Sequence, residues 1–183
     1  VTSGNANNVT TGATFTSNSV VNKPDDFGIR TTDLVSALTG NVVLKANNDI
    51  TIDSAIDASG NNNAGNLELQ AGRSIDINAN ITVEGSFTAI ANEESAKAGT
   101  RDAGDATFNS NGFTINTADS TASVHDISIS YQGGPGSGTP TGAMVIGTLN
   151  AGSSGAITIN STSSETVSVD AVTNASALTL TQS

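Results

Sequence analysis

The chain has 183 residues, of which 36% are hydrophobic and 3% aromatic, and it contains neither Cys nor Trp. Its net charge of −11 comes from 17 acidic against six basic residues, so we expect no nucleic-acid partner. The lack of cysteine excludes disulfides and thiolate metal sites, and no apolar run approaches the ~18 residues of a membrane span. Because so few aromatic side chains fill a thick core poorly, the composition favours a narrow, all-β solenoid.

The first 30 residues show little periodicity, and we interpret residues 1–30 as an irregular lead-in or an added-strand segment. The chain begins with Val1 and carries no signal-peptide pattern, as expected for a mature product or an excised segment. Residues 31–40 read TTDLVSALTG, with Asp33 near a helix start and Gly40 as a stop. This segment predicts either one or two helical turns or a strand that leads into the repeats.

The clearest feature of the sequence is an internal repeat. Residues 40–60 read GNVVLKANNDITIDSAIDASG and residues 65–85 read GNLELQAGRSIDINANITVEG. A shift of 25 residues makes eight of 21 positions identical, most of them apolar: Gly40/Gly65, Asn41/Asn66, Leu44/Leu69, Ala46/Ala71, Ile50/Ile75, Ile52/Ile77, Ile56/Ile81 and Gly60/Gly85. A solenoid requires this pattern, because each repeat stacks its buried side chains on those of the previous one.

Short segments of alternating apolar and polar residues predict strands along most of the chain. They are Val42–Lys45, Asp49–Asp53, Leu67–Gln70, Ser74–Asn78, Ile81–Val83, Phe87–Ala91, Ala106–Asn109, Phe113–Asn116, Asp126–Tyr131, Ala156–Asn160, Thr166–Asp170 and Ala177–Thr181. We expect Leu44, Ile50, Ile52 and Ile56 to point inward, beneath the matching residues of the second copy. Residues 31–183 then form a parallel β-helix of roughly seven turns, each ~4.8 Å along the axis.

Two segments interrupt this pattern. Residues 92–105, NEESAKAGTRDAGD, are charged and rich in Ala and Gly, and residues 132–142, QGGPGSGTPTG, are rich in Gly and Pro. Both predict loops extruded from the coil, since neither suits a central strand. The second segment also fits a linker between two domains, although strands of the same kind flank it.

Few residues suggest chemistry. The single histidine, His125, has no nucleophile context, and we interpret it as a surface or strand-edge residue. The group Asp49, Asp53, Asp57 and Asp76 resembles the clustered carboxylates of sugar-cleaving β-helices, but basic and aromatic partners are scarce. The same acids suit calcium only weakly, because tandem calcium-binding nonapeptides are missing. Four N-x-[ST] sequons, at Asn8, Asn80, Asn160 and Asn174, mark potential glycan sites.

The two copies of the repeat resemble the G-N-[LIV]-x-L-x-A-x-x-x-I-x-[IV] repeats of filamentous-haemagglutinin-like exoproteins, the secreted partners of two-partner secretion systems. The resemblance is strongest over residues 40–91 and looser over 106–183, where SGAITIN and ALTLTQ fit the same pattern. It implies a right-handed parallel β-helix, export to the bacterial cell surface and a role in adhesion. It implies no catalytic residues in this shaft-like region.

Three functions therefore compete. The first is an extracellular structural or adhesive β-helix that contacts host or neighbouring-cell glycans or proteins, with no enzyme activity and no cofactor or metal. The second is a subunit of an extracellular filament or biofilm matrix fibre that stacks end to end, because β-helix ends expose unpaired backbone. The third is a polysaccharide-acting β-helix enzyme, which the scarcity of aromatic residues disfavours.

Overall fold

A computed structural model describes residues 29–60, 64–96, 102–118, 125–134, 142–162 and 165–183. Within these ranges the chain forms one short helix and a series of mostly short strands. They are α1 (Thr31–Ala37), β1 (Val42–Ala46), β2 (Ile50–Ile52), β3 (Ile56–Asp57), β4 (Leu67–Ala71), β5 (Ile75–Ile77), β6 (Ile81–Thr82), β7 (Phe87–Ala91), β8 (Phe108–Asn109), β9 (Thr114–Asn116), β10 (Ile127–Tyr131), β11 (Met144–Asn150), β12 (Ala156–Ser161), β13 (Val167–Asn174) and β14 (Ala177–Gln182).

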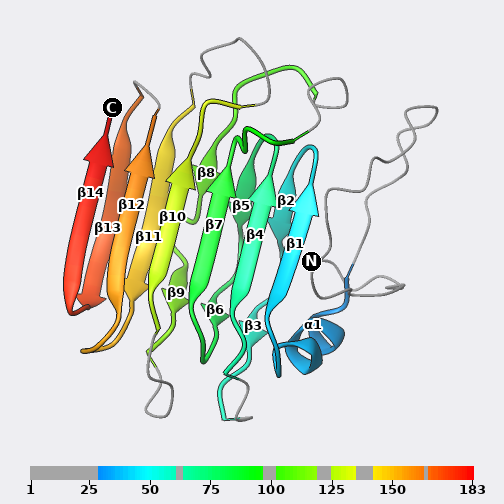
Figure 1. The fold of residues 1–183 in the computed structure, drawn as a ribbon, viewed down its shortest axis with the longest axis vertical. Coiled ribbons are helices and arrows are strands. Elements are labelled where there is room, and N and C mark those ends of the chain that lie inside the picture. The colour runs from blue at the N-terminus through cyan, green and yellow to red at the C-terminus, as the bar shows by residue number, and fades with distance from the viewer. Residues whose placement is uncertain (1–28, 61–63, 97–101, 119–124, 135–141, 163–164) are drawn as a thin grey trace.

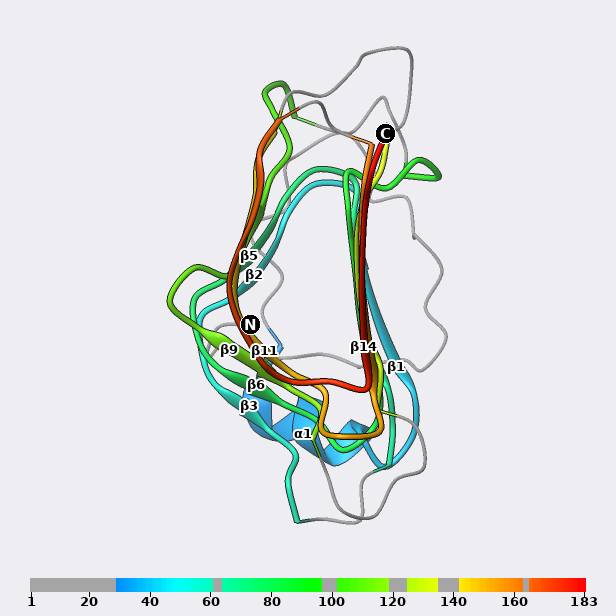
Figure 2. The ribbon, with the colours of Figure 1, turned by 90° about the vertical axis from the view of Figure 1, so that its left-hand side faces the viewer.

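The strands form two parallel sheets, which confirms a predominantly β structure. The first sheet has six strands in the order β1-β4-β7-β10-β12-β14. The second has the order β2-β5-β8-β11-β9-β6-β3, and β13 pairs with β11. Figure 1 shows the strands of the first sheet side by side, from β1 near α1 to β14 at the C-terminus. Figure 2 shows the two sheets on opposite sides of a common interior.

Residues far apart in the sequence stack in register across the first sheet. One inward column runs through Val42, Leu67, Phe87, Ile127, Ile157 and Leu178. A second column runs through Leu44, Leu69, Ala89, Ile129, Ile159 and Leu180. From β4 to β12, each strand therefore buries the same two or three positions over those of its neighbour, which explains why the apolar positions of the repeat are the ones that match.

A single core fills the space between the sheets. Among the described residues its large aromatic side chains are Phe87, Phe108 and Tyr131, and the remaining core residues are Ile, Leu, Val, Met and Ala. The Tyr131 hydroxyl donates to the carbonyl of Ala106 at 3.1 Å, so the one buried phenol is satisfied. The thin aliphatic core predicted from the composition is present.

Polar side chains form a ladder at the corner that precedes the first sheet. At each step the side chain of one turn accepts a hydrogen bond from the backbone N–H of the next. The donor-to-acceptor pairs are Asn66 N to Asn41 Oδ1 at 3.1 Å, Ser86 N to Asn66 Oδ1 at 2.7 Å, Asp126 N to Ser86 Oγ at 3.1 Å and Ala156 N to Asp126 Oδ1 at 2.8 Å. The ladder ends at Ala156, whose methyl group accepts nothing.

Next to this ladder the turns approach so closely that glycine is required. A Cβ atom on Gly65 would lie 2.1 Å from the carbonyl oxygen of Gly40, and one on Gly85 would lie 2.5 Å from that of Gly65. Gly40 itself, in the first turn, has nothing within 4 Å of such an atom. The identity Gly40/Gly65 therefore reflects close stacking of one turn on the next.

The strand predictions are confirmed with two omissions. The short strand β3 was expected only as an inward residue, Ile56, and β11 was missed altogether. β11 is a single seven-residue strand that pairs with both β8 and β9. Gly147 interrupts its apolar pattern because a Cβ there would lie 2.2 Å from the Phe113 carbonyl oxygen. Of the two predictions for residues 31–40, the helix is the correct one.

Two further expectations need correction. Gly60 and Gly85 match in the 25-residue repeat, but the strand that follows Gly85 pairs with a shift of 20 residues, Leu67 to Phe87. The segment after β3 is thus longer than the segment after β6, and Gly60 lies outside the stacked glycines. The first sheet has six strands in the described residues, one fewer than the roughly seven turns expected.

Most of the predicted lead-in, residues 1–28, lies outside the described residues, as do parts of the two predicted loops, 97–101 and 135–141. The described parts of those loops, 92–96, 102–105 and 132–134, contain no strand.

Candidate functional site

The four aspartates that suggested a sugar-cleaving site are only partly brought together. Asp49 forms an ion pair with Arg73 and accepts a hydrogen bond from Ser74 N at 3.0 Å. Asp53 accepts from Asn78 Nδ2 at 2.9 Å. Asp57 lies near α1 and accepts from the backbone and the hydroxyl of Ser59. Three of the four carboxylates thus hold neighbouring turns and bends in place.

Asp76 is the member of this group with the most unusual environment. It occupies the centre of β5, in register with Thr51 below and Asn109 above. Partial burial raises its pKa, and the negative charge of Asp49 raises it further, against a smaller opposing effect of Arg73. The pKa of Asp57, in contrast, is lowered by its hydrogen bonds to Ser59. No group of three or more His, Cys, Asp or Glu side chains suitable for a metal occurs among the described residues.

Arg73 connects this region to the segment that precedes β8. Its guanidinium donates to Asp49 and to the carbonyl of Ala103 at 3.1 Å. The hydrogen bond to Asp49 raises the pKa of Arg73 above its usual value, so the charge is fixed. A nearby hydrogen bond, from the backbone N–H of Asp102 to Asn48 Oδ1 at 2.6 Å, attaches the same segment to the first turn. The arrangement stabilises a long connection and offers no nucleophile.

His125 is buried, with 2% of its surface exposed, so the interpretation as a surface or strand-edge residue was wrong. It occupies the corner position that glycine takes in the turns before β4, β7 and β12, beside Gly85 and Gly155, and that Ser176 takes before β14. Its carbonyl accepts from the Thr117 hydroxyl. Its Nδ1 has no hydrogen-bond partner among the described residues.

Glu84 is the second buried polar residue of this corner region that the sequence did not suggest. It is 4% exposed, and its Oε1 accepts from Gly60 N at 2.5 Å. Its Oε2 is buried without a partner in the described part of the chain. No hydrogen bond joins Glu84 to His125 in that part, so the pair does not form an acid–base couple. Glu84 lies near the end of the second repeat copy, and no local pattern there predicts that a glutamate is buried.

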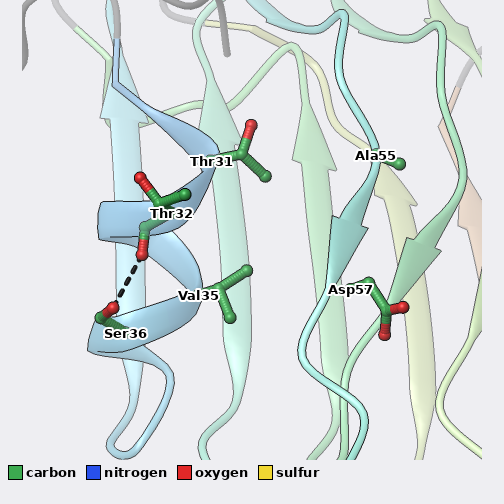
Figure 3. A pocket seen from close by; sticks show the side chains of 6 residues that line it. All are labelled: Thr31, Thr32, Val35, Ser36, Ala55 and Asp57. Carbon is green, nitrogen blue, oxygen red and sulfur yellow. Dashed lines mark hydrogen bonds between the residues drawn. The ribbon is translucent and has the colours of Figure 1, made fainter.

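A depression lies between α1 and β3, and Figure 3 shows its lining. Thr31, Thr32, Val35 and Ser36 contribute from the helix, and Ala55 and Asp57 from the facing strand region. The Ser36 hydroxyl donates to the Thr32 carbonyl at 2.8 Å. Asp57 is the charged residue among the six that line the depression. The depression is shallow and lacks the converging polar groups of a substrate site.

The most distinctive surface lies at the opposite end of the molecule. β13 and β14 each pair with a neighbour on one side only in the described structure. The exposed large hydrophobic side chains of the described residues all lie on these two strands: Val172 at 36%, Leu178 at 55% and Leu180 at 55%. We call this surface, residues 167–174 and 177–182, the C-terminal edge.

The sequons at Asn80, Asn160 and Asn174 lie on exposed residues, and Asn8 lies outside the described residues. Asn80 Oδ1 accepts from Thr114 N at 2.9 Å, so the side chain at this sequon supports the next turn. Among the described residues no helix is long and apolar enough to cross a membrane, and α1 has seven residues. No family model, curated protein or solved structure matches this chain significantly.

Proposed function

We propose that the chain is a right-handed parallel β-helix that serves as a structural or adhesive shaft segment of a secreted surface protein resembling the filamentous-haemagglutinin-like exoproteins. In this proposal it acts outside the cell, at a bacterial surface, with no catalysis. Contacts with glycans or proteins of a host or neighbouring cell are made by the polar outer faces of the strands.

The observation that carries the proposal is the regular stacking of the two inward columns of the first sheet. Six strands repeat the same inward positions, and the polar ladder satisfies backbone groups at the adjoining corner over five of them. Such a structure gains stability by repetition and needs no thick core, so it suits an elongated spacer. The choice of a right-handed coil rests on the general preference for right-handed crossovers between parallel strands.

The environment of the acidic residues supports a structural role. Asp49, Asp53 and Asp57 are hydrogen-bonded to their own or the next turn. A glycosidase needs two carboxyl groups that face a common substrate, one of them free to donate a proton. The polysaccharide-acting enzyme is therefore the third candidate.

Electron microscopy and small-angle scattering of the purified chain test the proposed shaft, combined with an assay for lyase and hydrolase activity on polygalacturonate. We expect a particle with a solid cross-section of two sheets, about 24 Å between the first and last strands of the first sheet, and no release of unsaturated or reducing ends. Dimensions that cannot hold six stacked strands would contradict the shaft. Polymer cleavage that is lost in D76N and retained in D170N would favour the enzyme.

Adhesion is tested by coating beads with the folded chain and counting the beads retained on surfaces of mucin glycoprotein or fibronectin. The control is the G65V variant, whose added side chain would meet two backbone carbonyls. Retention that depends on the folded chain supports an adhesive role. Equal retention of both preparations would limit the function to that of a spacer.

The filament subunit is the second candidate, and the exposed C-terminal edge favours it. The opposite end of the molecule opposes simple end-to-end stacking. α1 packs against β3 there, and its Leu34 and the adjoining Leu38 are fully buried in the core. A second copy that approached this end would meet α1 over β3.

A further inference from the structure

We propose that Asn111 is a site of spontaneous deamidation, in which the backbone nitrogen of Gly112 displaces the side-chain amide of Asn111 as ammonia and hydrolysis leaves aspartate or isoaspartate. Either product adds one negative charge to the net charge of −11. The inference goes beyond the proposed surface role and does not depend on it.

The first argument is the identity of the two residues. Asn111 and Gly112 are the one Asn–Gly pair among the 183 residues. The attacking nitrogen must come close to Cγ of the preceding side chain, and a side chain on the attacking residue hinders that approach. Glycine has no side chain and adopts backbone conformations that other residues avoid. Because the reacting groups belong to adjacent residues, their proximity favours the reaction.

The second argument is the exposure of the turn between β8 and β9. Asn111 and Gly112 form its tip, and both are exposed. The turn is closed by a hydrogen bond from Phe113 N to the Ser110 carbonyl at 3.0 Å. Gly112 has a φ of 79°, and a Cβ atom there would meet nothing within 4 Å. The tip therefore has room for the main-chain rotation that brings the Gly112 nitrogen to Cγ of Asn111, and water reaches both groups.

The third argument is that no hydrogen bond restrains the reacting groups. Among the described residues, neither the Asn111 side-chain amide nor the Gly112 N–H has a partner. Asn111 donates its own N–H to Asn109 Oδ1 at 3.1 Å, which involves neither reacting group. In contrast, the side-chain amide is hydrogen-bonded in Asn41, Asn48, Asn66, Asn78, Asn80, Asn92, Asn109, Asn116 and Asn150.

Asn160 gives the best comparison within the chain. It is also exposed, but the nitrogen that follows it belongs to Ser161. Both residues lie in β12, which pairs with β10 on one side and β14 on the other. The extended strand keeps the Ser161 nitrogen in the sheet and away from the Asn160 side chain. Exposure alone therefore does not make an asparagine of this chain reactive.

The reaction has two steps. In the first, the Gly112 nitrogen loses its proton to water or hydroxide and attacks Cγ of Asn111; the new N–Cγ bond closes a succinimide ring, and the amide nitrogen leaves as ammonia. In the second, one water molecule opens the ring. Cleavage of N–Cγ gives aspartate with a normal main chain. Cleavage between the Gly112 nitrogen and the main-chain carbonyl carbon of Asn111 gives isoaspartate. Nothing is oxidised or reduced.

The isoaspartate product lengthens the main chain by one carbon atom where the packing is close. The Phe113 carbonyl accepts from Thr148 N at 3.0 Å. A Cβ atom on Gly147 would lie 2.2 Å from the same carbonyl oxygen and 2.3 Å from that of Ser110. β11 pairs with β8 before this turn and with β9 after it. We therefore expect isoaspartate to weaken the hydrogen bond of Thr148, whereas aspartate leaves it in place.

The site is tested by incubating the purified 183-residue chain at about pH 7.4 and 37 °C for about four weeks, followed by peptide mapping with mass spectrometry. We expect Asn111 to be converted at an initial rate at least about tenfold above that of Asn160. The N111Q variant should stay unmodified there, because its longer side chain would have to close a larger ring. Conversion of both asparagines at the same rate would overturn the proposal. So would an Asn111 that keeps its amide while a synthetic FNSNGFTIN peptide is largely converted.

The structural consequence is tested by hydrogen exchange on the separated products. We expect the Thr148 N–H of the isoaspartate form to exchange at least about tenfold faster than that of the unmodified chain. Freshly prepared N111D is the matched control, because it carries the same added charge on a normal main chain, and it should exchange as the unmodified chain does. Equal exchange in the isoaspartate form and N111D would overturn the predicted weakening of this hydrogen bond.

Discussion

The two ends of this molecule show what a repeated structure needs beyond its repeat. In the first turn, α1 covers part of the end, and Leu34, Leu38, Val42 and Ile56 are buried. In the last turn, the inward residues Leu178 and Leu180 remain exposed. The strand pattern is the same at both ends, and α1 packs against β3 at the first of them. Burial in a solenoid depends on what lies above and below each turn more than on the residue itself.

The largest expected effect comes from the stacked glycines. The G65V variant adds a side chain that would begin 2.1 Å from the Gly40 carbonyl oxygen and 2.3 Å from that of Leu38, both backbone atoms. We expect a loss of about 3 kcal/mol or more in the free energy of unfolding, measured by urea denaturation. G40A is the control, because a Cβ there meets nothing within 4 Å, and its effect should stay below about 0.5 kcal/mol. Equal losses would mean that the turns do not stack as described.

The second prediction compares two leucines of one column. Leu69 is completely buried between two neighbouring strands, and Leu180 is 55% exposed at the C-terminal edge. We expect L69A to cost about 2–5 kcal/mol of unfolding free energy and L180A at most about 0.5 kcal/mol. The measurement is urea denaturation of both variants. A large effect of L180A under these conditions would show that the last turn is covered.

The third prediction removes the protection of the first turn. The variant L34E/L38E places two carboxylates at fully buried positions and should detach α1 from the core. With two charges at buried positions, the variant should lose about 3 kcal/mol or more of unfolding free energy in urea denaturation. T32E/S36E, which changes two exposed positions of α1, is the control and should behave as the unmodified chain. Unchanged stability of L34E/L38E would contradict the packing of α1 on the core.

The fourth prediction concerns the polar ladder, which ends before the last turn. N66A removes the acceptor of the Ser86 N–H group and should cost about 1–2 kcal/mol of unfolding free energy. N160A changes an exposed asparagine on the outer face of β12 and should cost less than about 0.5 kcal/mol. Urea denaturation of both variants gives the comparison. A smaller cost for N66A than for N160A would exclude a stabilising role of the ladder.

The smallest effect is one of pH. Because the folded-state pKa of Asp76 is raised above its unfolded value, its ionisation opposes folding. The native chain therefore loses stability from this group as the pH rises through the ordinary aspartate pKa and then through the raised folded-state pKa of Asp76. We expect D76N to be more stable than the unmodified chain at pH 7, with a gain that disappears near pH 3. D170N, an exposed acid on β13, should show no such crossover in denaturation at both pH values.

The sequence predicts the strands of this protein well because the alternation of apolar and polar residues within each strand shows which side chains are buried. Alternation placed Leu69, Ile75, Ile77 and Ile81 inward, and the register confirms all four over their partners. The strand β11 escaped because Gly147 serves a close backbone approach that a neighbouring turn imposes, and no local pattern records that neighbour. For residues 31–40 the local sequence is compatible with a helix or a strand, and the packing of this segment against β3 is not visible in it.

The polar features of the structure were much less predictable. The ladder joins Asn41 to Asn66 and then Ser86, so its members differ in type and are spaced by 25 and 20 residues. Only the first step coincides with the repeat. His125 and Glu84 are buried at corners where turns of unequal length meet. The composition and the local sequence pattern do not predict this burial. The aspartates stood out as a cluster, yet their hydrogen bonds serve the turns.

The most direct test of the stacked arrangement is the register between β4 and β7. Because the chain contains no cysteine, any disulfide that forms must join two introduced cysteines. Glu68 pairs with Thr88 in the structure, although the 25-residue repeat alone would place it beside Glu93. Neighbouring parallel strands bring paired Cα atoms within the range that a disulfide spans. We predict that E68C/T88C forms an intramolecular disulfide on mild oxidation and that E68C/E93C does not, as read by non-reducing gel and mass spectrometry. A crosslink in E68C/E93C alone would contradict the stacked arrangement.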